Sequence, residues 1–164
     1  MADIDLTWLP GHLAQTEAGQ AVRSLITAPH GREEDPVILA WALSSLANTA
    51  GQQRDTRTRL AASHAAVDTI RKAESAQPAE PQHRQDLVYL LANLGHALTD
   101  AARPIAAMRA FDEAIDLQRL ILASGLAPER EARDTLTSLL EDRDRAQHEL
   151  LLGPQAPVNA RLIP

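Results

Sequence analysis

The chain has 164 residues and a net charge of −6 at pH 7, and 45% of its residues are hydrophobic while only 2% are aromatic. This length fits one domain, and the apolar residues suffice for a core of Leu, Ala, Ile and Val. The negative charge disfavours nucleic acid as the partner, since phosphate binding needs a basic surface. The absence of cysteine excludes disulfides, a thiolate nucleophile and Cys-based zinc sites.

Apolar residues recur at helical spacing along the chain. Leu39, Leu43, Leu46 and Ala50 stand at i, i+4, i+7 and i+11, the period of an amphipathic helix, and no strand-like alternation accompanies them. The pattern predicts an all-α fold. About six helices are expected, at residues 10–28, 36–50, 54–76, 82–100, 104–124 and 129–152, followed by a flexible tail over 154–164.

Capping and helix-breaking residues set the expected boundaries. Asp35 followed by Pro36 is typical of a helix start, because the carboxylate caps free N–H groups and proline fits the first turn. Gly51 predicts the end of that helix, and Asp55 is placed to cap the next one. Gly125 likewise predicts the end of a later helix.

The chain also contains an internal repeat. Residues 39–67 align without a gap on residues 87–115, at an offset of 48 residues. A fixed period of about 20 to 50 residues is the signature of a stacked repeat, an architecture that favours binding over catalysis. The aligned pairs include Leu39 with Leu87, Trp41 with Tyr89, Leu43 with Leu91, and Leu46 with Leu94.

Seven residues of the second unit resemble the tetratricopeptide repeat (TPR). In that family small residues let two helices cross closely, and an aromatic ring fills the groove beside them. The first unit is a looser match, since Arg59 replaces the expected small residue and Ser63 the aromatic one. The matching positions of the second unit are Leu91, Leu94, Gly95 and Leu98 on its first helix, and Ala107, Phe111 and Ala114 on its second.

The resemblance implies a TPR-like α-solenoid, that is, a stack of antiparallel helix pairs. The period of 48 residues exceeds the usual TPR period of about 34, which indicates a long-helix variety. The implied organisation is a single domain over 1–153, with repeats at about 36–76 and 82–124 and end helices at 10–28 and 129–152. The polar face of the last helix suits a cap on the stack.

The first helix of each TPR pair lines a concave groove, and this property implies a set of candidate partner-binding residues. Aromatic rings beside amide and imidazole groups suit an extended peptide or an amphipathic helix. The alternative is that the two aromatic rings belong to the core between repeats and that the polar side chains cap nearby carbonyl groups. The groove positions are Trp41, Ser44, Asn48, Gln52, Tyr89, Ala92, His96 and Asp100.

The sequence carries no recognisable catalytic or metal-binding motif. Its six histidines include no pair at i, i+4 spacing, and it has no HExxH, Gly-rich phosphate loop or nucleophile elbow. We therefore expect no enzyme activity, no cofactor and no metal. The start MADIDLTWLP lacks the features of a signal peptide, and no apolar run approaches the roughly 20 residues that span a bilayer, so we expect a cytoplasmic protein without a membrane partner.

The expected function is a non-catalytic protein-protein interaction module or adaptor, whose groove takes a peptide or helix of a protein partner. The alternative is a small-molecule-binding or accessory component of a bacterial biosynthetic or regulatory enzyme system. A bacterial source is indicated by 15 arginines against one lysine, typical of a GC-rich genome. A homodimer is also expected, because two repeats are fewer than the usual three and Leu150, Leu151 and Leu152 exceed what one helix face buries.

Overall fold

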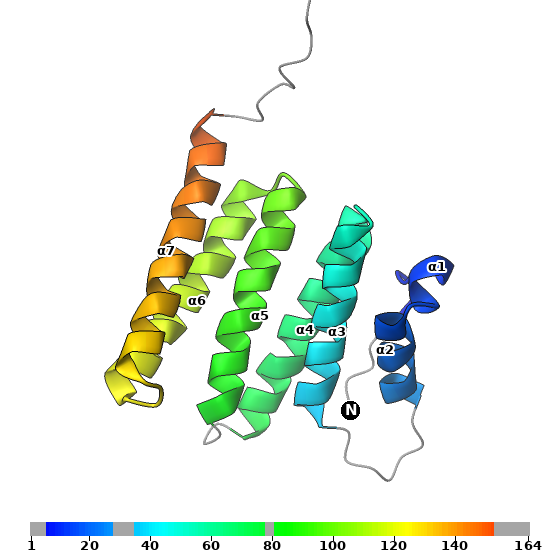
Figure 1. Ribbon diagram of the computed structural model, residues 1–164, viewed down its shortest axis with the longest axis horizontal. Coiled ribbons are helices and arrows are strands. Elements are labelled where there is room, and N and C mark those ends of the chain that lie inside the picture. The colour runs from blue at the N-terminus through cyan, green and yellow to red at the C-terminus, as the bar shows by residue number, and fades with distance from the viewer. Residues whose placement is uncertain (1–5, 28–34, 78–80, 153–164) are drawn as a thin grey trace, which may run out of the picture.

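The computed structural model describes residues 6–27, 35–77 and 81–152, and within them the chain is all-α (Figure 1). The helices pack in order against their chain neighbours, as in a helical repeat. Five of the six expected helices are confirmed to within two residues at each end. The helices are α1 (Gly11–Ala14), α2 (Glu17–Thr27), α3 (Pro36–Gln52), α4 (Thr56–Ala76), α5 (Pro81–Asp100), α6 (Pro104–Ser124) and α7 (Glu129–Leu152).

The prediction of one helix over residues 10–28 is wrong, since the structure divides it into α1 and α2. Thr16 makes the break: its hydroxyl donates to the Leu13 carbonyl oxygen at 2.6 Å and accepts from the Gly19 N–H at 3.1 Å. A Cβ atom at Gly19 would overlap the Leu13 carbonyl, so only glycine allows α1 to fold back onto α2. The described part of the chain therefore has seven helices, one more than predicted, and residue 28 lies outside it.

The predicted helix caps form. The Asp35 carboxylate accepts the N–H of Val37 at 2.9 Å, at the start of α3. At the start of α4, Asp55 accepts both the N–H of Thr58, at 3.0 Å, and its hydroxyl, at 2.7 Å. Gly125 ends α6 in the left-handed conformation, with φ of 66°.

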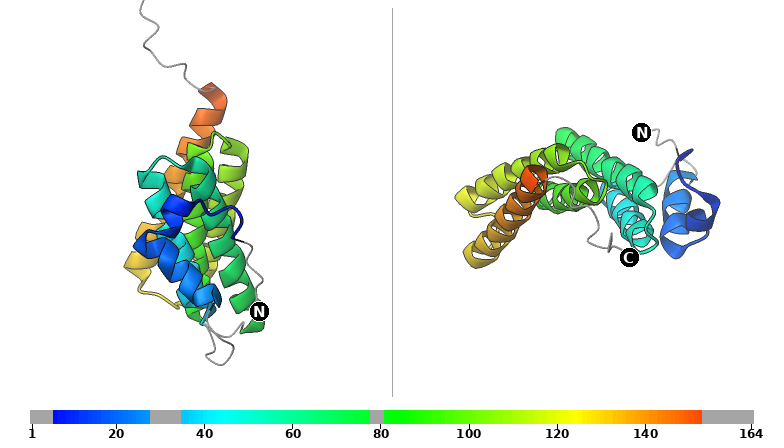
Figure 2. Two further views of the ribbon diagram at one scale, coloured as in Figure 1. Left: turned by 90° about the vertical axis from the view of Figure 1, so that its right-hand side faces the viewer. Right: turned by 90° about the horizontal axis from the view of Figure 1, so that it is seen from above.

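The helices form two layers that bend around a concave side. Seen from above, α3, α5 and α7 lie on the inner side of the bend, and α4 and α6 lie on the outer side (Figure 2). On the inner side, α5 packs against both α3 and α7. The outer helices α4 and α6 lie further apart, and an ion pair of long side chains links them. In that pair the Arg71 guanidinium of α4 lies 2.6 Å from the Glu113 carboxylate of α6.

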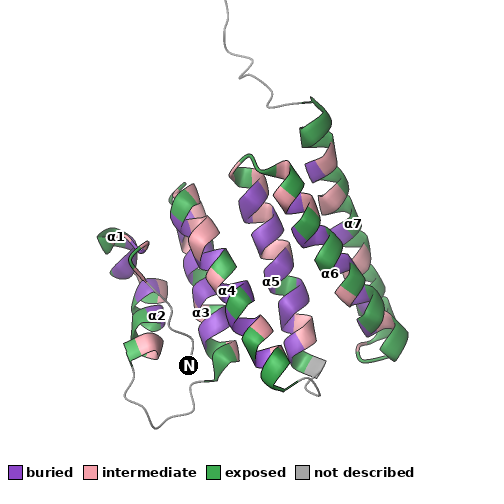
Figure 3. Ribbon diagram, turned by 180° about the vertical axis from the view of Figure 1, so that it is seen from behind, coloured by how far each residue is buried: buried purple, intermediate pink, exposed green. Residues whose placement is uncertain are grey.

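The buried residues of each helix face the neighbouring helices, and exposed residues cover the outside (Figure 3). The two unexpected residues of the first repeat have different roles in this packing. Ser63 is buried where the TPR pattern places an aromatic ring. Arg59 extends beside Gly51 and forms an ion pair with Asp100 of α5, and its partial burial lowers the pKa of the guanidinium.

Helix α7 continues the repeat as the first helix of a third pair. Its buried residues Leu139 and Ala146 stand 48 positions after the buried Leu91 and Leu98 of α5, and its buried Ala132 stands 48 positions after the half-buried Arg84. The same offset relates the first residues of the two helices, 81 and 129. Within the described residues the repeat therefore has three inner helices and two outer ones.

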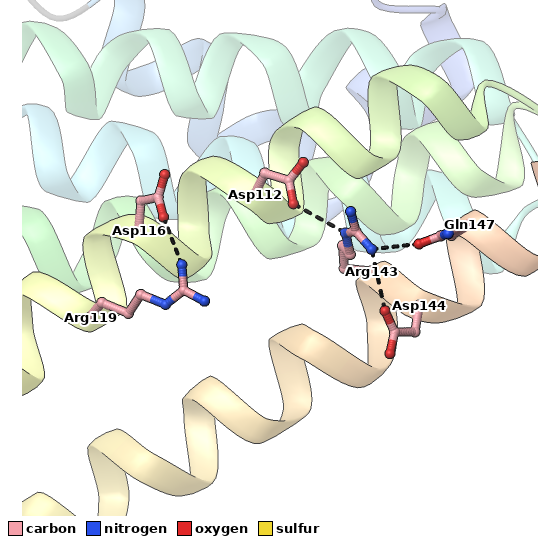
Figure 4. A network of polar contacts seen from close by, with 6 residues as sticks. All are labelled: Asp112, Asp116, Arg119, Arg143, Asp144 and Gln147. Carbon is pink, nitrogen blue, oxygen red and sulfur yellow. Dashed lines mark hydrogen bonds and ion pairs between the residues drawn. The ribbon is translucent and has the colours of Figure 1, made fainter.

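Arg143 of α7 replaces the small residue that the first two repeats have at this position. It stands 48 positions after Gly95, which receives the ring of Phe111 in the second repeat. The Arg143 guanidinium turns back to Asp112 of α6, at 3.2 Å, and also bonds Asp144 and Gln147 (Figure 4). A charged, hydrogen-bonded side chain therefore stands where the second repeat has glycine, and polar residues of this kind suit the outer face of a helix stack.

Candidate functional site

The inner side of the stack carries a pair of exposed aromatic rings. The ring centroids of Trp41 on α3 and Tyr89 on α5 are 4.9 Å apart, and the ring planes are inclined by 37°. Trp41 is 37% and Tyr89 50% exposed, so neither ring is buried in the core between the repeats. The 48-residue offset predicted that these rings lie side by side, and they do. We call the two rings the aromatic platform.

The polar groove candidates of α3 lie at different depths. Asn48 and Gln52 are exposed on the same helix as Trp41. Ser44 is buried at 4% exposure, and its hydroxyl accepts a hydrogen bond from the Asn93 side chain of α5 at 3.2 Å. Ser44 therefore lies in the contact between the two helices, beneath the platform.

The candidates of α5 are divided between two regions. Asp100, at the end of α5, is engaged by Arg59 of α4. His96 lies between α6 and α7: its ring meets Phe111 edge-on, with centroids 5.3 Å apart, and its Nε2 atom lies 3.3 Å from a carboxylate oxygen of Asp142. The structure thus brings Tyr89 and His96 to one region of the inner side and leaves Asp100 outside it.

A cavity of about 430 Å³ lies between α5, α6 and α7. Tyr89 belongs both to its wall and to the aromatic platform, so the two features are continuous. Its volume is within the range of pockets that hold small ligands or a ligand's side chain, roughly 300–1,000 Å³. The polar residues that line it are Gln85, Asn93 and His96 of α5, Gln118 of α6, and Glu131, Thr135, Ser138 and Asp142 of α7.

The equivalent junction of the first repeat is filled by apolar side chains. The α5 residues Leu87, Leu90 and Leu94, each at most 5% exposed, correspond by the 48-residue offset to Thr135, Ser138 and Asp142 of α7. Likewise Ile70 of α4, which is fully buried, corresponds to Gln118 of α6. The cavity therefore arises where four large apolar residues of one junction become smaller or polar residues in the next.

Acidic groups dominate the charge of the cavity. Its lining includes the carboxylates of Glu131 and Asp142 and contains neither lysine nor arginine. The Asp142 side chain is 14% exposed, and besides His96 it contacts Arg145 at 2.9 Å. Gln118 donates from its amide to the carbonyl oxygen of Ala132 at 3.0 Å, which fixes α7 against α6 at this place.

Tyr89 and His96 of the predicted groove line the cavity, but the sequence analysis names none of the residues that α6 and α7 contribute to it. These residues are Gln118 of α6 and Thr135, Ser138 and Asp142 of α7. The 48-residue offset could have found all four, because extending it past residue 115 aligns Gln118 with Ile70, and Thr135, Ser138 and Asp142 with leucines of residues 87–94. A polar residue at a core position of a repeat is the signal that was overlooked.

A second hollow, of about 510 Å³, lies between α2 and α3. Small side chains such as Ala18, Ala21, Ala42 and Ser45 line it, with one acidic residue, Glu17, and no aromatic ring. It offers fewer groups for recognition than the cavity beside Tyr89.

Within the described residues, no three His, Asp or Glu side chains are placed to hold a metal ion. Nor does any helix of that part of the chain have the length and apolarity required to cross a membrane. The chain matches no protein-family model, and no curated protein or solved structure is similar enough to count as a relative.

Proposed function

We propose that this protein is a non-catalytic interaction module of the TPR type, which binds a peptide or short helix of a protein partner on the inner side of its stack. The observation that carries the proposal is the aromatic platform. Trp41 and Tyr89 come from equivalent positions of successive repeats, contact each other, and are exposed on α3 and α5, which lie on the inner side of the bend.

Exposed aromatic rings have a large apolar surface, and covering that surface with a partner contributes favourable free energy to binding. Tryptophan and tyrosine are enriched among the residues that dominate binding energy, because they offer large rigid surfaces at little cost in side-chain entropy. Two such rings in contact form one apolar surface, and the exposed Asn48 and Gln52 of α3 supply polar groups nearby. This combination of apolar anchor and polar surroundings suits a peptide.

The close crossing of α5 and α6 supports the TPR assignment. Gly95 and Phe111 occupy the small and aromatic positions of that pattern and contact each other. The concave inner helices and the outer second helices also follow the arrangement that the resemblance implies.

A small-molecule-binding role is the second candidate, and the cavity favours it. A ligand of drug size fits about 430 Å³, and several polar groups converge there. This role requires only the cavity, whereas the peptide role requires the aromatic platform, so the two are separable by variants.

The test is selection of a displayed library of random peptides on the full chain, followed by affinity measurements on the selected peptides. Trp41→Ala should weaken binding by about 30-fold or more, the effect of losing an anchor worth at least about 2 kcal/mol. The matched control is Ile105→Ala, which removes an exposed apolar side chain from α6. This variant should bind the peptides as the unmodified protein does.

Melting curves on the same samples separate binding from folding. Trp41 is 37% exposed, so Trp41→Ala should lower the free energy of unfolding by less than the roughly 3–5 kcal/mol that truncation of a fully buried aromatic residue costs. Peptides that bind equally well to Trp41→Ala, or a selection that yields no binding peptide, would contradict the proposal.

A further inference from the structure

The junction that forms the cavity beside Tyr89 differs from the equivalent junction of the first repeat, because polar residues replace apolar ones there. The first junction buries Ile70, Leu87, Leu90 and Leu94, whereas the second carries polar groups at all four positions. Apolar residues would fill the space and stabilise the stack by removing apolar surface from water. The polar residues thus leave a hollow that adds little to packing and is available to a ligand.

The charge of the lining favours a cationic ligand. Glu131 and Asp142 line the cavity, and no lysine or arginine of the lining opposes them. Arg145 contacts one oxygen of Asp142, and His96 the other, but a carboxylate oxygen accepts more than one hydrogen bond. Glu131 and Ser138 are exposed, so the carboxylate and the hydroxyl are accessible to a ligand. The charged side chains of the lining are acidic, and an anionic group would therefore be repelled.

The shape of the lining favours arginine over lysine. The planar side chains of Tyr89 and His96 belong to the same wall, and a guanidinium stacks on such rings while it donates to a carboxylate. Val88, Ala92 and Leu139 give the wall an apolar part against which the three methylene groups of an arginine stem can pack.

We infer that the bound peptide inserts an arginine side chain into the cavity between α5, α6 and α7 while an apolar residue of the same peptide covers Trp41 and Tyr89. The inference rests on the proposed function and adds the chemistry of the partner. Continuity through Tyr89 links the two contacts, since this residue belongs to both surfaces.

The first experiment uses N-acetyl-L-arginine methylamide as a probe, with the citrulline analogue as its neutral control. Backbone amide signals of the full chain are followed by NMR during titration. The arginine probe should shift the signals of Tyr89, Thr135 and Ser138, and the citrulline probe should bind at least about tenfold more weakly, because it lacks the charge that strengthens the hydrogen bonds. Equal shifts with both probes, or no shifts at these residues, would overturn the inference.

Two variants of α7 test the site itself. Asp142→Asn removes a carboxylate of the cavity, and its control Glu141→Gln removes an exposed one of the same helix outside the cavity. Ser138→Leu restores the residue type found at the equivalent Leu90, and its control Thr137→Leu adds the same side chain outside the cavity. Both cavity variants should weaken the arginine probe about tenfold or more, and both controls should leave it unchanged.

Ser138→Leu and Asp142→Asn test different properties of the cavity, its space and its charge. Ser138→Leu should keep or raise the melting temperature, because the leucine adds an apolar side chain to the cavity, so loss of the probe in this variant reports a filled cavity and not unfolding. Equal losses in Asp142→Asn and Glu141→Gln would show general attraction to an acidic protein and overturn the inference.

The selected peptides distinguish this inference from the proposed function. Peptides that need Trp41 and lose at least about tenfold in affinity when one arginine becomes citrulline support both. Peptides that need Trp41 but tolerate citrulline everywhere leave the platform as the binding site and overturn the arginine contact. An arginine probe that binds the cavity without any peptide that depends on Trp41 would reject the proposed function instead.

Discussion

The ring of Phe111 lies so close to Gly95 that a Cβ atom on the glycine would stand 2.5 Å from the ring carbon Cζ. The first repeat places Ala47 and Ser63 at the equivalent positions, and both are buried. One repeat thus combines no side chain with a large ring, and the other combines a methyl group with a small hydroxyl side chain. The methyl group and the ring thus exchange at the same helix crossing: the ring is present where the methyl group is absent, because the two would overlap.

This exchange predicts that the effect of Gly95→Ala reverses with the residue at position 111. In the unmodified protein the new methyl group overlaps the ring, and the free energy of unfolding should fall by about 1–3 kcal/mol. In the Phe111→Leu background the overlap is relieved, and Gly95→Ala should stabilise α5 by up to about 1 kcal/mol through its helix propensity. Denaturant unfolding of the four proteins measures both effects.

Phe111→Ala serves as the reference for the core, and it should cost about 3–5 kcal/mol because the ring is fully buried. The same cost for Gly95→Ala in both backgrounds would show that something other than the ring requires glycine. An unchanged melting temperature in Phe111→Ala would contradict the packing of the second repeat.

A second prediction concerns the break between α1 and α2. Gly19→Ala should destabilise the N-terminal helices, because the added Cβ atom meets the backbone carbonyl of Leu13, which no side-chain rotation can relieve. Gly11→Ala is the matched control, since a Cβ atom there meets no other atom within 4 Å. Hydrogen exchange of α2 amides should accelerate in the first variant and stay unchanged in the second. Equal exchange in both would mean that α1 does not fold back on α2.

A third prediction follows from the cap of α4. The hydrogen bond from the Thr58 N–H lowers the pKa of the Asp55 carboxyl, so the folded state favours the charged form. A lowered folded-state pKa contributes stability above the unfolded-state pKa, and this contribution is lost as the pH falls through the folded-state value. Asp55→Ala should therefore cost about 1 kcal/mol at neutral pH, and the cost should shrink in acid.

Asp55→Asn is the control for this pH dependence. Asparagine caps a helix about as well as aspartate but does not ionise, so its stability relative to Asp55→Ala should not vary with the charge of residue 55. A cost of Asp55→Ala that is constant from neutral pH into the acid range would contradict the role of the carboxylate.

A fourth prediction is that the protein forms a dimer through the end of α7. Leu150, Leu151 and Leu152 are 40%, 73% and 56% exposed, so the helix buries none of the three fully. Sedimentation at micromolar concentration should give about twice the monomer mass of 17.8 kDa. Leu151→Ser should shift the protein towards the monomer, and the control Leu120→Ser, on α6, should not. A clean monomer in the unmodified protein would reject the dimer.

The sequence alone predicted most of the helix boundaries because their causes are local. Asp35 and Asp55 cap the first free N–H groups of their own helices, and Gly125 adopts a backbone conformation that other residues avoid. The break at Thr16 was missed although its cause is also local, because the apolar spacing continues across it. The 48-residue offset correctly placed Trp41 beside Tyr89, since equivalent positions of stacked repeats lie side by side.

Tertiary structure decided which of these residues a ligand can reach. Ser44 and Asn48 stand four positions apart on α3, yet one is buried against Asn93 and the other is exposed, because α5 covers only part of that helix. Asp142 meets His96 only because Gln118 and the apolar stripe of α7 seat that helix against α6. Periodicity and capping act within a helix and determine where each one begins and ends. Exposure, and the cavity between α5, α6 and α7, depend on which helix packs against which face.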